Sequence, residues 1–198
     1  MRSLMLLLLA LLCVTGTACS RATMVETRWD GRTGQTTTRR FSMYFEAAAE
    51  IVPGTVGAHL IVDLEKREVP ILYDLQQALG LLGPGDLEAG GLFTMYLFNL
   101  TDRPQEVEIT SATRWGRPVL AAPVTVALVP RDWKRRVVLG RTVIGSYDTR
   151  EELDLTVTVA GRRYTTRLVA ERQTFDALER KYGRGGTGPD LPWLKPRS

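Results

Sequence analysis

The sequence has little of the chemistry that catalytic and metal sites need. Its 198 residues include one histidine, His59, and two cysteines, Cys13 and Cys19. Structural zinc sites use about four His or Cys ligands, and a serine hydrolase needs a histidine base beside its nucleophile. No Gly-x-Ser-x-Gly turn surrounds any serine. We therefore expect no enzyme, no metal and no cofactor. Although Asp63 and Asp74 lie near His59 in the sequence, we expect a histidine that faces solvent or lies at the rim of the domain.

The chain also lacks a strong charge of one sign. Its formal net charge is +4, and basic residues are interspersed with acidic ones along the whole length. A nucleic-acid-binding domain is expected to carry a one-sided basic patch, so we expect no nucleic-acid partner. The length fits one domain of ordinary size with short flanking segments.

Only one long apolar run is present, and it lies near the N-terminus. Arg2 precedes eleven apolar residues from Leu4 to Val14, and small residues follow. This run is shorter than the roughly 20 residues that cross a bilayer as a helix. The arrangement is typical of a secretory signal, so we predict a signal peptide over residues 1–18.

The four residues Gly16-Thr17-Ala18-Cys19 resemble the lipobox of bacterial lipoproteins. They differ from the common form at Gly16, where leucine is usual. The resemblance implies acyl chains, palmitate among them, on the mature N-terminal Cys19, which would hold the protein in a membrane. Ser20 follows the cysteine, which resembles the pattern for sorting to the outer membrane, on its periplasmic side.

The alternative is ordinary signal cleavage after Ala18, which also fits the small residues at the junction. The protein would then be soluble in the periplasm or secreted, with Cys19 as a free thiol. Cysteine number favours lipidation, because removal of Cys13 with the leader leaves Cys19 without a disulfide partner in an oxidising compartment.

The rest of the chain shows the alternation of β-strands. We predict a flexible tether over 19–35, a β domain over 36–172, and a short helix with a flexible Pro/Gly-rich tail over 173–198. Alternating or continuous apolar residues predict strands at 36–45, 60–64, 92–100, 107–109, 124–128, 133–139, 153–159 and 164–168.

Turn and helix signals separate these strands. Asn99 to Pro104 predicts a hairpin turn between two strands, and Ala160-Gly161 predicts a tight reversal. Residues 71–82 have helical spacing between Pro70 and Gly83, which predicts a short amphipathic helix. One or two further helical turns are expected at 175–182.

The segment Leu97 to Ile109, LFNLTDRPQEVEI, resembles a strand, turn and strand of immunoglobulin-like or fibronectin-like domains. The resemblance implies an antiparallel β-sandwich and carries no function with it. We therefore predict a mainly β fold, an immunoglobulin-like sandwich with one short amphipathic helix. A small β-barrel is the alternative, because both architectures bury one face of every strand.

Two features are candidates for interaction. Trp133, Arg135 and Arg136 lie in a basic aromatic segment that suits acidic headgroups or cell-wall polymers, or protects an edge strand by charge. Trp193 lies in an apolar stretch of the tail that fits a partner groove or folds back over the domain.

These observations predict a membrane-anchored, non-enzymatic cell-envelope lipoprotein that acts as a binding or assembly module. Its partners would be the membrane and an envelope protein or cell-wall component. The alternative is a periplasmic carrier of a lipid or other apolar ligand, held between the sheets or under the helix at 71–82.

Overall fold

The computed structural model describes residues 23–65, 88–130, 135–145, 148–183 and 185–194. The predicted signal peptide, Cys19, the predicted helix at 71–82 and Trp133 lie outside these residues. In the described part of the chain, no helix is long and apolar enough to cross a membrane.

The described residues are mainly β-strand, as the alternation predicts. The strands are β1 (Thr23–Asp30), β2 (Gln35–Ser42), β3 (Tyr44–Val52), β4 (Val56–Glu65), β5 (Glu88–Asn99), β6 (Gln105–Arg114), β7 (Arg117–Pro118), β8 (Val124–Leu128), β9 (Arg135–Gly145), β10 (Arg150–Val159) and β11 (Arg162–Arg172). Helix α3 (Phe175–Tyr182) and the 3₁₀ turn η2 (Pro192–Leu194) follow them.

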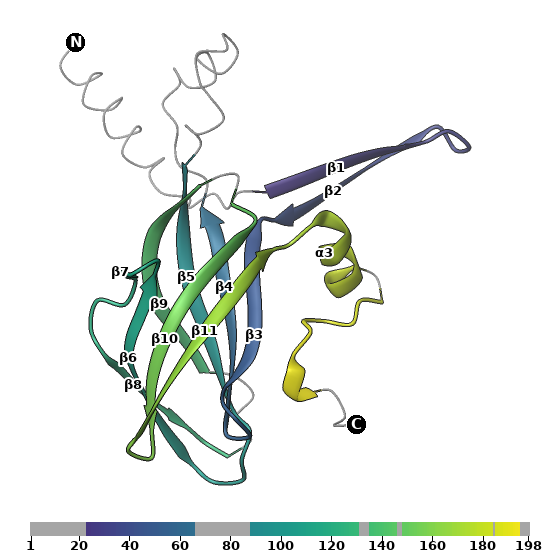
Figure 1. The fold of residues 1–198 in the computed structure, drawn as a ribbon. Helices are drawn as coiled ribbons and strands as arrows, with labels where there is room; N and C mark the ends of the chain where they lie inside the picture. Colours follow the sequence, from purple (N-terminus) through teal and green to yellow (C-terminus); the bar gives the residue numbers. More distant parts are fainter. Residues whose placement is uncertain (1–22, 66–87, 131–134, 146–147, 184, 195–198) are drawn as a thin grey trace, which may run out of the picture.

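Nine of these strands form one antiparallel sheet, with the order β7-β6-β10-β11-β3-β4-β5-β9 and β8 also beside β6. Figure 1 shows that the sheet curls into a half-barrel. Only two residue pairs, Glu171 with Glu46 and Arg172 with Phe45, join β11 to β3. The sheet therefore has two arms: β3, β4, β5 and β9 form the β4 arm, and β6, β7, β8, β10 and β11 form the β10 arm. This architecture is compatible with the predicted sandwich and with a small barrel.

The hydrophobic core fills the space between the two arms. Because successive side chains of a strand point to opposite faces, alternate apolar residues of each arm face the other arm. The largest of these side chains are almost completely buried: Phe45, Leu60, Phe93, Met95 and Leu97 from the β4 arm, and Ile109, Leu128, Leu153, Leu155 and Leu168 from the β10 arm. Such cores are packed about as densely as organic crystals.

On the open side of the half-barrel, the two edges of the sheet come into contact. Nη1 of Arg114 in β6 donates to the carbonyl of Val143 in β9 at 3.0 Å. The same guanidinium holds the fully buried Glu151 of β10 through two hydrogen bonds. Gly140 has a φ of +158°, and a Cβ there would lie 2.1 Å from the carbonyl oxygen of Val119. A residue without a side chain is needed for this approach.

The structure places a hairpin where we expected a flexible tether. Strands β1 and β2 pair along their full length, and the resulting two-stranded sheet projects away from the rest of the molecule (Figure 1). Thr27 lies opposite Thr38, and Gly34 provides the positive φ of the turn. β-branched threonines suit a strand, but their polarity hides the apolar alternation on which the sequence prediction relied.

The two predicted reversals have different outcomes. Ala160 and Gly161 both have positive φ and join β10 to β11, which confirms that hairpin. The predicted hairpin at 99–104 is wrong, because β5 pairs with β4 and β9 whereas β6 pairs with β10. The Asn99 side-chain amide donates to the carbonyls of Arg103, Leu128 and Val129, so this turn carries the chain from one arm to the other.

The end of the chain is packed against the domain. Helix α3 forms at the predicted residues and begins at Thr174, whose hydroxyl accepts a hydrogen bond from the backbone N–H of Ala177. The following tail, expected to be flexible, buries Leu191 and places the ring of Trp193 with its centroid 4.8 Å from that of Phe98. Trp193 therefore folds back over the domain, one of the two alternatives that the sequence left open.

Candidate functional site

The face of the β4 arm that points away from the core carries polar and aromatic side chains. The strand register places them in rows: Tyr44 lies opposite Asp63, Ile61 opposite Thr94, and Tyr96 opposite Arg136. Helix α3 packs against this face and contributes Leu178 and Tyr182.

A pocket of about 510 Å³ lies between this face and α3, and we call it the α3 pocket. Its size is within the range of small-molecule sites, roughly 300–1,000 Å³. The described residues that line it are Ser42, Tyr44, Ile61, Asp63, Thr94, Tyr96, Arg136, Leu178 and Tyr182.

The exposure of these side chains distinguishes the floor of the pocket from its rim. Leu178 is 1% exposed, Thr94 is 2% exposed and Tyr44 is 9% exposed, so these residues form the floor. Tyr182 is 48% exposed and Arg136 is also exposed, which places both at the rim. The pocket therefore has a buried floor and a solvent-exposed rim.

Two hydroxyl groups on the floor have no hydrogen-bond partner among the described residues: the Tyr44 hydroxyl and Oγ1 of Thr94. Buried polar groups in native proteins are almost always paired, so two unpaired ones in a single pocket point to a ligand. Burial raises the pKa of Tyr44 well above its usual value, and Tyr182 and Glu46 add to the effect. The Tyr44 hydroxyl is therefore protonated at physiological pH.

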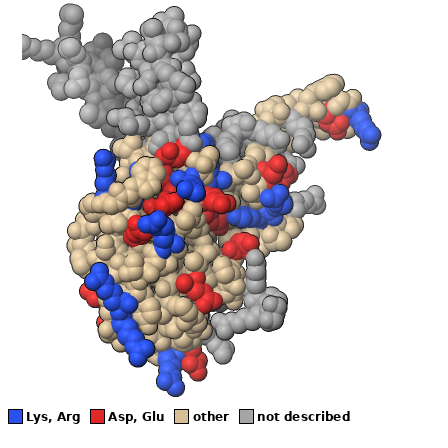
Figure 2. Space-filling model, in the orientation of Figure 1, with Lys and Arg blue, Asp and Glu red and all other residues tan. Residues whose placement is uncertain are grey.

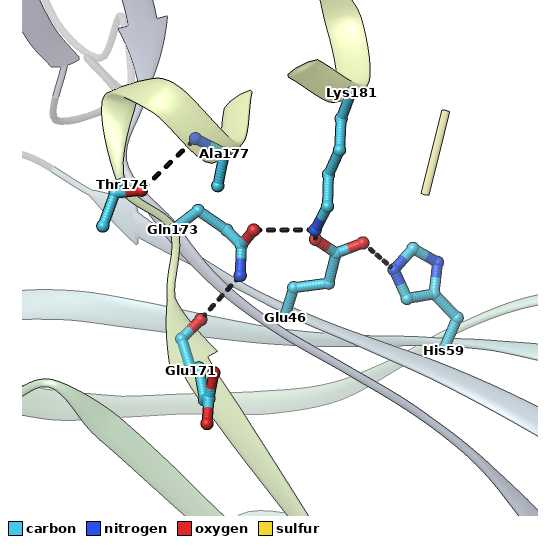
Figure 3. A network of polar contacts seen from close by, with 7 residues as sticks. All are labelled: Glu46, His59, Glu171, Gln173, Thr174, Ala177 and Lys181. Atoms are coloured by element: carbon cyan, nitrogen blue, oxygen red, sulfur yellow. Dashed lines mark hydrogen bonds and ion pairs between the residues drawn. The ribbon is translucent and has the colours of Figure 1, made fainter. Parts of the chain in front are cut away.

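Beside the pocket, a buried polar network fixes α3 to the sheet (Figure 3). Nε2 of His59 donates to Oε1 of Glu46 at 2.8 Å, and Nζ of Lys181 donates to Oε2 of Glu46 at 2.5 Å. Lys181 also donates to Oε1 of Gln173 at 2.7 Å, and the Gln173 amide donates to the carbonyl of Glu171. Glu46 is thus the centre that joins β3, β4 and α3.

The network explains the charge state of its members. Burial works to raise the pKa of Glu46, but hydrogen bonds from His59 and Lys181 outweigh it, and the pKa lies below its usual value. The carboxyl is therefore ionised at neutral pH. His59 is 6% exposed, so the expectation of a solvent-facing histidine is wrong, and Glu46 is the carboxylate that orients it.

The structure separates the predicted interaction residues. Arg136 lines the α3 pocket, but Arg135 precedes it on an extended strand, where successive side chains point to opposite faces. Trp193 lies against Phe98, and a Cβ on the neighbouring Gly57 would lie 2.8 Å from its ring. Cys19 and Trp133 lie outside the described residues, so their roles stay predictions.

The sequence analysis missed Tyr44, Thr94 and Glu46. A signal was present, since Tyr44 and Glu46 alternate with the core residue Phe45, and Thr94 and Tyr96 alternate with Met95. Polar residues at every second position of a strand show that its other face is solvated or covers a polar site.

The outer face of the β10 arm has a different character. Arg167 contacts Asp154 at 2.6 Å and Glu152 at 3.5 Å, and all three side chains are partly or largely exposed. Figure 2 shows positive and negative side chains mixed over the visible face of the molecule. This face therefore offers no one-sided charge for a polyanionic partner.

Comparison with known proteins finds no matching family model, no matching curated protein and no matching solved structure.

Proposed function

We propose that this chain is a membrane-anchored, non-enzymatic binding module of the bacterial cell envelope, and that the α3 pocket holds its ligand. In this proposal acyl chains on Cys19 attach the protein to the outer membrane, on its periplasmic side. The observation that carries the binding role is the pair of buried, unpartnered hydroxyls of Tyr44 and Thr94.

The same observation favours a polar ligand over an apolar one. Each buried hydroxyl without a partner costs about 1–3 kcal/mol, and a hydrocarbon ligand would cover both without pairing either. A ligand with its own donors and acceptors would recover that free energy. None of the described residues that line the α3 pocket belongs to the apolar cluster between the two arms, and a hollow of about 540 Å³ beside Arg180 and Pro189 is also lined by residues outside that cluster. The carrier of an apolar ligand is therefore the weaker proposal.

The histidine network supports a binding role over a catalytic one. A general base must reach the proton that it removes. The Nε2 of His59 is instead directed to Glu46, which is also held by Lys181. His59 thus serves to position α3, which forms one wall of the pocket.

Attachment through Cys19 is tested by replacing it with serine and separating membrane from soluble fractions of cells. We expect Cys19→Ser protein to move into the soluble fraction, because two or more acyl chains are what hold such a protein stably in a bilayer. Intact mass of the wild-type N-terminus should show the acyl chains. Continued tight membrane association of the variant would contradict the anchor.

Binding at the α3 pocket is tested by photo-crosslinking in cells. A benzoylphenylalanine at Tyr182, which keeps an aromatic ring at the rim, should form an adduct with an envelope component. The control is the same side chain at Val169, which is 42% exposed on the outer face of the β10 arm. An adduct at both positions, or at neither, would count against a ligand in this pocket.

A further inference from the structure

We propose that the ligand of the α3 pocket is an N-acetylated amino sugar within a glycan. This inference deepens the proposed function, because it rests on the pocket being a binding site and names the chemistry that the site takes.

The hydroxyl groups on the floor of the pocket favour a ligand with neutral hydrogen-bonding groups. A hydroxyl both donates and accepts, so Tyr44 and Thr94 can pair with a sugar hydroxyl or with the carbonyl of an acetamido group. Both side chains are at least nine-tenths buried, and neither has a partner among the described residues. They come from β3 and β5, on either side of β4, so the ligand would lie across β4.

The apolar part of the lining suits a sugar as well. Ile61 and Leu178 lie with the two hydroxyls in the same pocket. An acetamido group presents a methyl, a carbonyl and an N–H within a few bonds, which matches apolar and hydroxyl groups side by side. Tyr96 and Tyr182 add aromatic rings, each an apolar surface with a polar end that fits the C–H face and hydroxyl edge of a pyranose.

The charges of the lining argue against a simple ion as the ligand. Among the described lining residues Arg136 is the one cation and Asp63 the one carboxylate. With one charge of each sign, the described lining has no net charge that would select an anion or a cation. Both groups can instead hydrogen-bond to the hydroxyls of a neutral polyol.

The test uses the full mature chain, purified from cells in detergent, and two soluble glycans. One probe is the β-1,4-linked trimer of N-acetylglucosamine, and the other is the glucose trimer of the same linkage, which lacks the acetamido groups. Saturation-transfer NMR and calorimetry should show binding of the N-acetylated trimer, with the glucose trimer at least about tenfold weaker. Thr94→Val and Tyr44→Phe should each weaken binding of the N-acetylated trimer by about fivefold to tenfold, as expected for one lost hydrogen bond.

Thr125→Val is the matched control, because Thr125 is exposed on β8 and is not among the lining residues. Its affinity for the N-acetylated trimer should equal that of the wild type. Equal binding of the two trimers, or unchanged binding in Thr94→Val and Tyr44→Phe, would overturn the inference. If the N-acetylated trimer does not bind while the crosslink at Tyr182 still forms, the sugar assignment fails and the binding module stands. If the N-acetylated trimer does not bind and the crosslink at Tyr182 does not form, both the sugar assignment and the binding module are wrong.

Discussion

In the proposed binding role, single residues on the floor of the α3 pocket favour binding at the expense of stability. Thr94 and Tyr44 bury hydroxyls that the described protein does not pair. Burial without a partner is unfavourable in the free protein and becomes favourable only when a ligand supplies the missing hydrogen bond. Binding sites commonly show this exchange of stability for function.

Thr94→Val and Tyr44→Phe should each stabilise the free protein. Each change keeps the shape of the side chain and removes an unpaired buried hydroxyl, so we expect a gain of about 1 kcal/mol in the free energy of unfolding. Urea unfolding without ligand measures it. A loss of stability of similar size would show that the hydroxyls make structural hydrogen bonds and would remove the main argument for the pocket.

Glu46 should make the stability of the protein depend on pH in the acid range. Its pKa in the folded state lies below the usual value of 4.5, so its stabilising contribution is complete above about that pH and is lost as the pH falls through the folded pKa. At pH 7 we expect Glu46→Gln to lower the free energy of unfolding by about 1–3 kcal/mol.

The difference between Glu46→Gln and the wild type should shrink as the pH falls below about 4.5. Denaturant unfolding between pH 7 and pH 3 measures this change. Glu106→Gln, at an exposed position of β6, is the control and should differ little from the wild type at any pH. A difference that stays constant down to pH 3 would contradict the assigned role of Glu46.

At the scale of elements, local capping interactions define the two ends of helix α3, and a few contacts with residues distant in the sequence hold it to the sheet. Thr174 caps its N-terminus, and the backbone N–H of Gly183 donates to the carbonyl of Glu179 at its end. With eight residues it is too short to be stable by itself, so its attachment depends on Leu178 and Lys181. An element held this way is expected to open locally before the sheet does.

Leu178→Ala should release α3 and leave the sheet intact. Leu178 is 1% exposed, and truncation of a buried leucine typically costs about 2–5 kcal/mol, here mainly from the local attachment of the helix. Hydrogen exchange should accelerate in α3 and remain slow in β10. Arg180→Ala, at an exposed position of the same helix, is the control. Equal acceleration in β10 would show that α3 and the sheet unfold as one unit.

The sequence predicts where strands and turns lie better than it predicts which strands pair with one another. Strands β8 and β10 follow from alternation alone, and the reversal at Ala160-Gly161 follows from local turn chemistry. The turn at Asn99 does not, because the three carbonyls that its side chain binds include two from residues 29 and 30 positions away. Pairing between distant strands leaves no local signal.

The candidate site could not be predicted from the sequence for the same reason. Glu46 and Lys181 are 135 positions apart, and their contact exists only after the chain has returned to β3 through β11. Among the predicted interaction residues that the structure describes, Arg136 is the one that lines the pocket. Its neighbours on that face are assembled by strand register, which alternation does not specify.

At the scale of the whole molecule, the buried group around Arg114 closes the half-barrel. Arg114 joins β6 and β10 to the far edge of the sheet at Val143, and it leaves Glu151 buried with an arginine as its partner. The exposed ring of Trp115 lies 4.0 Å from the Arg114 guanidinium carbon and covers it from solvent. Removal of Arg114 would leave the carboxyl group of Glu151 buried without its arginine partner.

Arg114→Met should therefore destabilise the protein by about 3–5 kcal/mol, whereas Arg114→Met combined with Glu151→Met should recover much of that loss. Urea unfolding of the two variants and the wild type measures the difference. A double variant as unstable as the single one would show that the hydrogen bond from Arg114 to Val143, rather than the buried charge, holds the edges together.

The projecting hairpin has a mechanical consequence for the pocket. Ser42 ends β2 and lines the α3 pocket, and only Met43 separates it from Tyr44 at the start of β3. The end of the hairpin that joins the domain therefore lies at the wall of the pocket. The chain leading back to Cys19 enters the hairpin at Thr23, which lies opposite Ser42 at this same end. A pull on that chain would therefore act next to Ser42 and Tyr44 and change the shape of the pocket.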